Sequence, residues 1–178
     1  MRIATTEAGN LPYWVDAEVL DLVGLNSRDT AREPPSRALL EAFAPDLVLV
    51  HPADGLDRAH LERDDPDLGR EVVRLEAPLR RYVTPERARF YAEGLPRYRD
   101  LNAENTQVAP IVTFAFLDAH AADYDVYAVP ARTGGGLHVI AVRRAWPERD
   151  EVLRSLLDTE THRRAPYLRV SRRMANAR

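Results

Sequence analysis

The stretch Ser36–His51, which reads SRALLEAFAPDLVLVH, predicts a helix that is followed after a short turn by a buried strand. The hydroxyl of Ser36 can cap the helix, because serine accepts hydrogen bonds from the unpaired amides of a first turn. Pro45 ends the helix, and the apolar run Leu47–Val50 is typical of a strand buried on both faces. The apolar residues that share one helical face are Leu39, Leu40 and Phe43.

Outward from this stretch, strands and helices alternate. Further strands are expected at Arg2–Thr6, Val19–Leu25, Glu71–Ala77, Asp125–Arg132 and Leu137–Arg143. Further helices are expected from Thr84 to Gly94, at Val108–Ala119 and at Pro147–Leu157, with a loop at Asn102–Gln107. The order predicts an α/β fold, a three-layer sandwich with a mixed, mostly parallel sheet, in which Val19–Leu25 and Leu47–Val50 are interior strands. The glycine-rich connection Thr133–Gly136 predicts a late β-hairpin.

The composition is that of one globular domain. The chain has 178 residues, of which 45% are hydrophobic and 30% are charged. We expect a single α/β domain over residues 1–162 and an arginine-rich tail over residues 163–178. All 25 basic residues are arginine and there is no cysteine. Disulfides, thiolate metal sites, cysteine nucleophiles and every form of lysine chemistry are therefore excluded.

The net charge of −3 is unevenly distributed. Residues 163–178 carry six arginines and no acid, whereas residues 1–162 carry 19 arginines against 28 acids. The body should therefore repel nucleic acid, which is not expected as a partner. The segment Arg163–Arg178 is expected to lie outside the core and to bind an anionic membrane surface, with a disordered end of no function as the alternative.

No catalytic residue, metal or cofactor is expected from local motifs. The five histidines include no pair at helical zinc spacing, and there is no HExxH motif. A Gly-x-Ser-x-Gly motif is absent as well. The Thr133–Gly136 loop precedes a strand instead of a helix, which favours a hairpin over a phosphate-binding loop.

The turn after the first strand is a candidate ligand-binding site. If the sheet is parallel there, this turn lies at the carboxyl end of a strand, where α/β proteins place ligands. Gly9 would allow the backbone to approach a ligand closely. Glu7, Asn10 and Tyr13 offer hydrogen bonds and a stacking face, a combination that suits a sugar. The alternative is a glycine turn with Tyr13 and Trp14 in the core.

A second candidate follows the buried strand Leu47–Val50. His51 and Asp54 are spaced to form an acid–base pair, although such a pair without a nucleophile or metal is more often structural. Asp21 lies among apolar neighbours in the expected strand Val19–Leu25. Because a buried carboxylate without a partner is costly, we expect Asp21 to have a structural role and a polar partner.

Two N-terminal segments, Ile3–Trp14 and Val19–Asn26, resemble a pattern in polytopic membrane glycosyltransferases of the GT-C type, which use lipid-linked sugars. In these enzymes a soluble domain follows the last transmembrane helix. The segment Tyr124–Tyr127 resembles the end of the same domain. Beyond Asn26 the resemblance otherwise rests on the order of strands and helices. The residues that match are Gly9, Pro12, Tyr13, Asp21, Gly24, Leu25 and Asn26.

The resemblance implies an accessory domain at the extracytoplasmic face of the cell membrane. Its partner would be the transmembrane portion of the same polypeptide, and it would bind an acceptor glycan or lipid-linked sugar or stabilise the enzyme. The catalytic acid of that family lies between early transmembrane helices, which this chain lacks, so no glycosyl transfer by the chain alone is implied. The alternative is a free-standing small α/β enzyme, a hydrolase or transferase, that uses His51 and Asp54.

Overall fold

A computed structural model describes residues 1–6, 16–24, 27–28, 30–32, 34–50, 72–82, 101–130 and 137–158. The chain divides into two compact units, Met1–Trp146 and Pro147–Arg178, and each is described by itself. Among the described residues, no helix has both the length and the apolar character that a membrane crossing requires.

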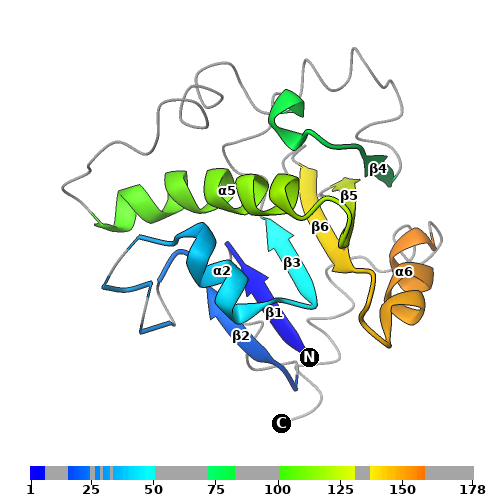
Figure 1. The fold of residues 1–178 in the computed structure, drawn as a ribbon, viewed down its shortest axis with the longest axis horizontal. Helices are drawn as coiled ribbons and strands as arrows, with labels where there is room; N and C mark the ends of the chain where they lie inside the picture. The colour runs from blue at the N-terminus through cyan, green and yellow to red at the C-terminus, as the bar shows by residue number, and fades with distance from the viewer. Residues whose placement is uncertain are drawn as a thin grey trace, which may run out of the picture. The chain divides into compact units, whose positions relative to one another are not determined.

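The first unit is built on a six-stranded sheet with the order β2-β1-β3-β6-β5-β4 (Figure 1). This sheet and its helices confirm the predicted α/β class. The strands are β1 (Arg2–Thr5), β2 (Glu18–Asp21), β3 (Leu47–Val50), β4 (Val73–Leu75), β5 (Tyr124–Pro130) and β6 (Leu137–Arg143).

The sheet is mixed, but the prediction that it is mostly parallel is wrong. Strand β1 pairs in parallel with β2 and β3, whereas the β3–β6, β6–β5 and β5–β4 pairs are antiparallel. The physical reason is the predicted late hairpin, β5–β6, which is confirmed and which joins the sheet beside β3. Strand β3 is interior, as predicted.

The expected interior position of Val19–Leu25 is also wrong. Strand β2 lies at the edge of the described sheet, and β1 has the neighbours on both sides. The strand ends at Asp21, four residues earlier than expected, because the chain bends over Leu22–Gly24.

The described residues of the first unit form the helices α2 (Arg37–Phe43) and α5 (Leu101–Ala119) and the 3₁₀ helix η1 (Leu79–Tyr82). The Ser36 hydroxyl accepts a hydrogen bond from the Leu39 amide at 3.1 Å, which confirms the predicted cap. The helix α2 ends at Ala44, which has a left-handed φ of 47° and donates its amide to the Leu40 carbonyl.

The loop expected at Asn102–Gln107 is instead part of α5. These residues are polar, which suggested a connection. They include Ala103, Glu104 and Gln107, which have high helix propensity, so the helix extends through them.

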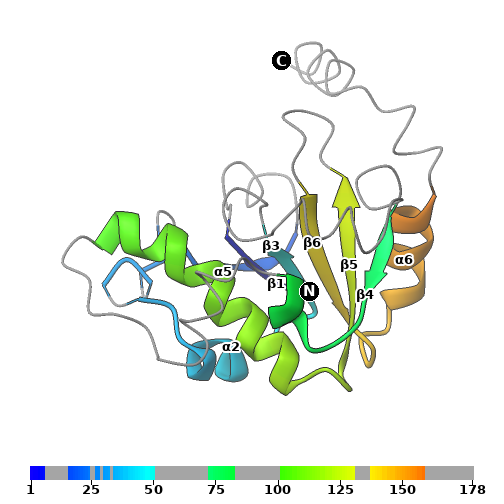
Figure 2. The ribbon, with the colours of Figure 1, turned by 90° about the horizontal axis from the view of Figure 1, so that it is seen from above.

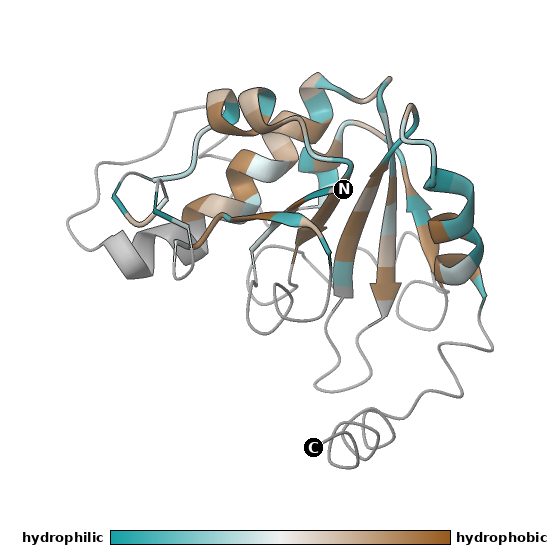
Figure 3. Cartoon of the chain, turned by 90° about the horizontal axis from the view of Figure 1, so that it is seen from below, coloured by the Kyte–Doolittle hydropathy of each residue, from teal (hydrophilic) through white to brown (hydrophobic). Residues whose placement is uncertain are grey.

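The main core lies between the sheet and the helices α2 and α5, which cover one face together (Figures 1 and 2). Ala4, Val48, Ala141 and Val126 are successive register partners across four strands, and all are buried on this face. The apolar colouring of the strands and of α5 follows this layer (Figure 3). On the opposite face, Ile3 and Val142, which are both register partners of Leu47, are also buried, as a sheet within an α/β sandwich requires.

The second unit contains the helix α6 (Arg149–Leu157), which lies within the predicted helix Pro147–Leu157. Asp150 and Glu151 occupy its first turn, where negative charge interacts favourably with the helix dipole. The predicted tail Arg163–Arg178 and the helix expected from Thr84 lie outside the described residues.

Candidate functional site

The carboxyl ends of the neighbouring strands β1 and β3 lie side by side at one end of the strands, and this place is called the β1/β3 edge below. The Thr6 amide donates to the Leu49 carbonyl at 3.0 Å, and Thr5 and Leu49 are register partners. The first candidate segment follows β1 and the second begins directly after β3. Strand β1 is parallel to both of its neighbours, so the condition for a ligand site at its carboxyl end is met. The six predicted site residues, Glu7, Gly9, Asn10, Tyr13, His51 and Asp54, themselves lie outside the described residues.

Asp21 has the structural role that was predicted. Its carboxylate is buried, and its Oδ1 accepts hydrogen bonds from the Val23 amide at 3.0 Å and the Gly24 amide at 3.2 Å. Its own amide donates to Ser27 Oγ at 2.8 Å, and the hydroxyl of the buried Thr30 donates to its carbonyl. These bonds close a turn between β2 and the residues that follow. The polar partners expected for the Asp21 side chain are therefore main-chain amides of this turn.

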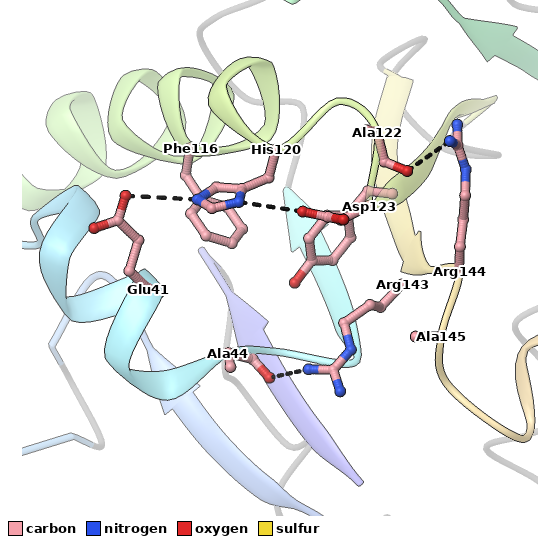
Figure 4. A pocket seen from close by; sticks show the side chains of 10 residues that line it. Glu41, Ala44, Phe116, His120, Ala122, Asp123, Arg143, Arg144 and Ala145 are labelled. Carbon is pink, nitrogen blue, oxygen red and sulfur yellow. Dashed lines mark hydrogen bonds and ion pairs between the residues drawn. The ribbon is translucent and has the colours of Figure 1, made fainter.

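A hollow of about 380 Å³ opens at the opposite edge, near the amino ends of β1 and β3 (Figure 4). It lies among the end of α2, the last turn of α5, the start of β5 and the end of β6, and is called the His120 hollow below. None of its residues was among the predicted site residues. It is lined by Glu41, Ala44, Phe116, His120, Ala122, Asp123, Tyr124, Arg143, Arg144 and Ala145.

The imidazole of His120 lies between two carboxylates in this hollow (Figure 4). Its Nδ1 is 3.4 Å from Asp123 Oδ2, and its Nε2 is 3.5 Å from Glu41 Oε1. Within the described part of the chain Nε2 is buried and makes no hydrogen bond, so its contact with Glu41 is an ion pair only when the ring is protonated. The ring also packs on Phe116, with the two centroids 4.7 Å apart. A neutral imidazole has one N–H, so only the protonated ring presents a donor to both carboxylates.

Tyr124 and Arg143 tie the end of α2 to the hairpin. The Tyr124 hydroxyl donates to the Pro45 carbonyl at 2.6 Å, and Arg143 donates to the Ala44 carbonyl at 3.0 Å. Arg143 also lies 3.6 Å from Asp46. Burial of the Tyr124 phenol is the main reason why its pKa is raised from 10.0 to about 12.

This pKa predicts a stability loss at high pH. Because the fold favours the protonated phenol, its contribution is complete below pH 10 and falls as the pH rises towards 12. The loss should reach about 2–3 kcal/mol at most. In Tyr124→Phe we expect a cost of about 1 kcal/mol at neutral pH, from the lost hydrogen bond, and a weaker decline above pH 10. Urea unfolding of both proteins across this range measures the difference, and parallel declines would contradict the assignment.

A second buried carboxylate fixes the turn between α5 and β5. Asp125 is 2% exposed, and its Oδ1 lies 2.8 Å from Arg74 and 3.1 Å from Arg144. Arg144 also donates to the Ala122 carbonyl at 2.6 Å. Since both guanidinium groups are about half exposed while the carboxylate is buried, this cluster holds the turn in place.

The His120 hollow combines polar and apolar side chains. Its lining contains no serine, cysteine or lysine, and the described residues contain no group of three His, Asp or Glu side chains that could hold a metal. What the hollow offers are carboxylate acceptors, an imidazole and guanidinium groups beside aromatic and methyl walls. The spacing of His120 and Asp123 after an apolar helix is a local signal in the sequence that could have indicated this site.

Comparison with known proteins gives a family but no relative of known activity. No curated protein and no solved structure matches the chain. One family model matches residues 1–128, which contain β1 to β4, both helices of the main core and most of β5. The matched part covers 72% of the 178 residues and includes the His120 hollow as far as Tyr124. The chain therefore belongs to the family described as Domain of unknown function (DUF8728).

Proposed function

We propose that the chain is an accessory domain of a membrane glycosyltransferase, and that it binds an acceptor glycan or a lipid-linked sugar at the carboxyl ends of β1 and β3. The observation that carries this proposal is the strand order β2-β1-β3 with parallel pairing. The chain runs from β1 to β2 on one side, while β3 lies on the other side of β1. The β1/β3 boundary is thus a topological switch point, where open α/β sheets bind their ligands.

The residues that follow these strands have the chemistry of a sugar site. Glu7 and Asn10 carry oxygens that accept hydrogen bonds from hydroxyls, and Tyr13 supplies an aromatic face. His51 and Asp54, which follow β3, add further polar groups in the neighbouring segment. With no nucleophile motif among these residues, binding is a better-supported role than catalysis.

The resemblance of Ile3–Asn26 to the GT-C soluble domain supports the proposed setting. In that setting the transmembrane portion of the same polypeptide is the partner, and the domain lies at the extracytoplasmic face of the membrane. Arg163–Arg178, with six arginines and no acid, would add an attraction to anionic lipids of about 1 kcal/mol for each arginine near the surface.

The test is an NMR titration of the ¹⁵N-labelled chain with oligosaccharides of mannose and of arabinose. We expect the amide signals of Thr5, Thr6 and Val50, which lie at the carboxyl ends of β1 and β3, to shift on binding. Tyr13→Ala should weaken binding about tenfold, because one aromatic contact contributes about 1 kcal/mol or more. Asp150→Asn, at an exposed side chain in α6, serves as the control and should leave this affinity unchanged.

Two results would contradict the proposal. If only the amide signals of Thr133–Gly136 shifted, the ligand would bind at the hairpin connection and not at the β1/β3 edge. Turnover of a substrate by the chain alone, abolished by His51→Ala, would instead identify the free-standing enzyme that was the alternative.

A further inference from the structure

The His120 hollow has the size of a small-molecule site. Its volume of about 380 Å³ falls in the range of roughly 300–1,000 Å³ that is usual for ligand pockets. Figure 4 shows the side chains of Glu41, His120 and Arg143 arranged around the opening, with Phe116 behind the imidazole. Ala44, Ala122 and Ala145 contribute methyl groups to the walls.

The formal charges that line the hollow cancel. Glu41 and Asp123 are balanced by Arg143 and Arg144. An organic cation would meet both guanidinium groups, and an organic anion would meet both carboxylates. The net charge therefore gives neither class of ion an advantage.

Both guanidinium groups already have partners in the protein. Arg143 is bound to the Ala44 carbonyl and to Asp46, and Arg144 is bound to Asp125 and to the Ala122 carbonyl. A phosphate or carboxylate ligand would have to compete with these bonds for the same guanidinium groups, whose fixed fork of donors is what makes arginine a good anion receptor.

The two carboxylates of the hollow can accept more hydrogen bonds than they receive from the protein. The Asp123 side chain is 63% exposed and contacts His120 through Oδ2, and the Glu41 side chain is 39% exposed and contacts Arg37 and His120 through Oε1. Each carboxylate has about four lone-pair positions, more than these contacts use. A suitable ligand donates hydrogen bonds without carrying a formal charge.

We infer that the His120 hollow is a second binding site, for a neutral molecule with adjacent hydroxyl groups, such as a single sugar residue. Its hydroxyls donate to Asp123 and Glu41, and its C–H groups pack against the alanine methyls and the aromatic wall. This site is distinct from the β1/β3 edge, because it lies at the amino ends of the same strands. It stands whether or not that edge binds a glycan.

A matched series of ligands tests the inference. Methyl glycosides that differ in hydroxyl orientation are titrated into the ¹⁵N-labelled chain, together with an amino sugar and a uronic acid of the same ring size. At least one neutral glycoside should shift the amide signals of Ala122, Asp123 and Arg144 and should bind more tightly than either charged analogue. Tighter binding of the amino sugar or the uronic acid, or unmoved signals at these residues for every glycoside, would overturn the inference.

Three variants test the location. Asp123→Asn removes a charged acceptor from an exposed position and should weaken binding about tenfold. Ala122→Trp, also at an exposed position, should fill the hollow and abolish the shifts. Asp150→Asn makes the same chemical change as Asp123→Asn in α6, at a side chain that is 80% exposed, and should leave binding intact.

Unfolding curves first establish that the three variants remain folded. Wild-type affinity in both Asp123→Asn and Ala122→Trp would show that the sugar binds elsewhere. Shifts restricted to Thr5 and Thr6 would support the β1/β3 site and reject this one, so that the two proposals fail separately.

Discussion

Replacing Asp21 with alanine should lower the free energy of unfolding by about 3–4 kcal/mol, because the buried amide of Val23 and the partly buried amide of Gly24 lose their acceptor together. The Asp21 carboxylate is 1% exposed and receives the amides of Val23 and Gly24. For a chain of this length the melting temperature should fall by roughly 6–16 °C.

Two further variants separate the hydrogen bonds from the charge. Asp21→Asn keeps an oxygen acceptor at the same position, and it should recover most of the stability lost in Asp21→Ala. Asp16→Ala removes an exposed acid shortly before β2 and should change stability by no more than about 0.5 kcal/mol. An Asp21→Ala protein that melts at the wild-type temperature would refute the structural role of this carboxylate.

The structural role of Asp21 also bears on the resemblance to the GT-C domains. Asp21 and Gly24 both belong to the matching pattern, and both build the turn after β2. These two matches therefore carry information about the fold of this segment. The functional side of the resemblance rests on the other matching residues, above all Gly9, Pro12 and Tyr13, which follow β1 in the sequence.

The parts of the fold that could be predicted are those with strong local signals. Ser36 before three apolar residues at helical spacing marked α2, and the run Leu47–Val50 marked β3. The glycine-rich connection between two apolar segments marked the β5–β6 hairpin. In each case neighbours in the sequence determine the structure, since caps and short turns are local interactions.

The order of the strands could not be predicted in the same way. Strand β6 lies between β3 and β5, and β2 lies at the edge. This order depends on pairing between segments that are distant in the sequence, which local patterns do not reveal. The mixed burial of β2, where Glu18 is exposed and Leu20 is buried, is visible only once its neighbour is known. An apolar strand therefore indicates burial but does not identify its partners.

The His120 hollow could not be predicted for the same reason, because contacts between segments distant in the sequence form it. Glu41 lies in α2 and His120 directly follows α5, and neither residue lies in a motif that predicts the other. Their approach requires α2 and α5 to pack side by side on one face of the sheet. Asp123 alone lies close to His120 in sequence, so only this half of the arrangement was open to prediction.

Replacing Gly24 with alanine should destabilise the protein by about 4 kcal/mol, through strain and through the loss of the Asp21 turn. Gly24 has a φ of 91°, a conformation that costs alanine about 1–2 kcal/mol. The added Cβ would lie 2.5 Å from the carbonyl oxygen of Thr30 and 2.9 Å from the amide nitrogen of Ala31. Both are main-chain atoms, so the contact cannot be relieved by turning a side chain.

The turn must open to admit this methyl group, and the opening weakens the bonds from Gly24 and Thr30 to Asp21. Gly24→Asn separates the strain of a positive φ from the contact of the Cβ with Thr30, because asparagine tolerates positive φ better than alanine but carries the same Cβ. Equal losses in both variants would assign the effect to the contact with Thr30.

Ala44→Gly is the opposite case, since Ala44 already has a φ of 47° and glycine should stabilise the protein by about 0.5–1 kcal/mol. Unfolding free energies of the three variants measure these effects, and a Gly24→Ala protein as stable as the wild type would show that the turn after β2 is not closed as described.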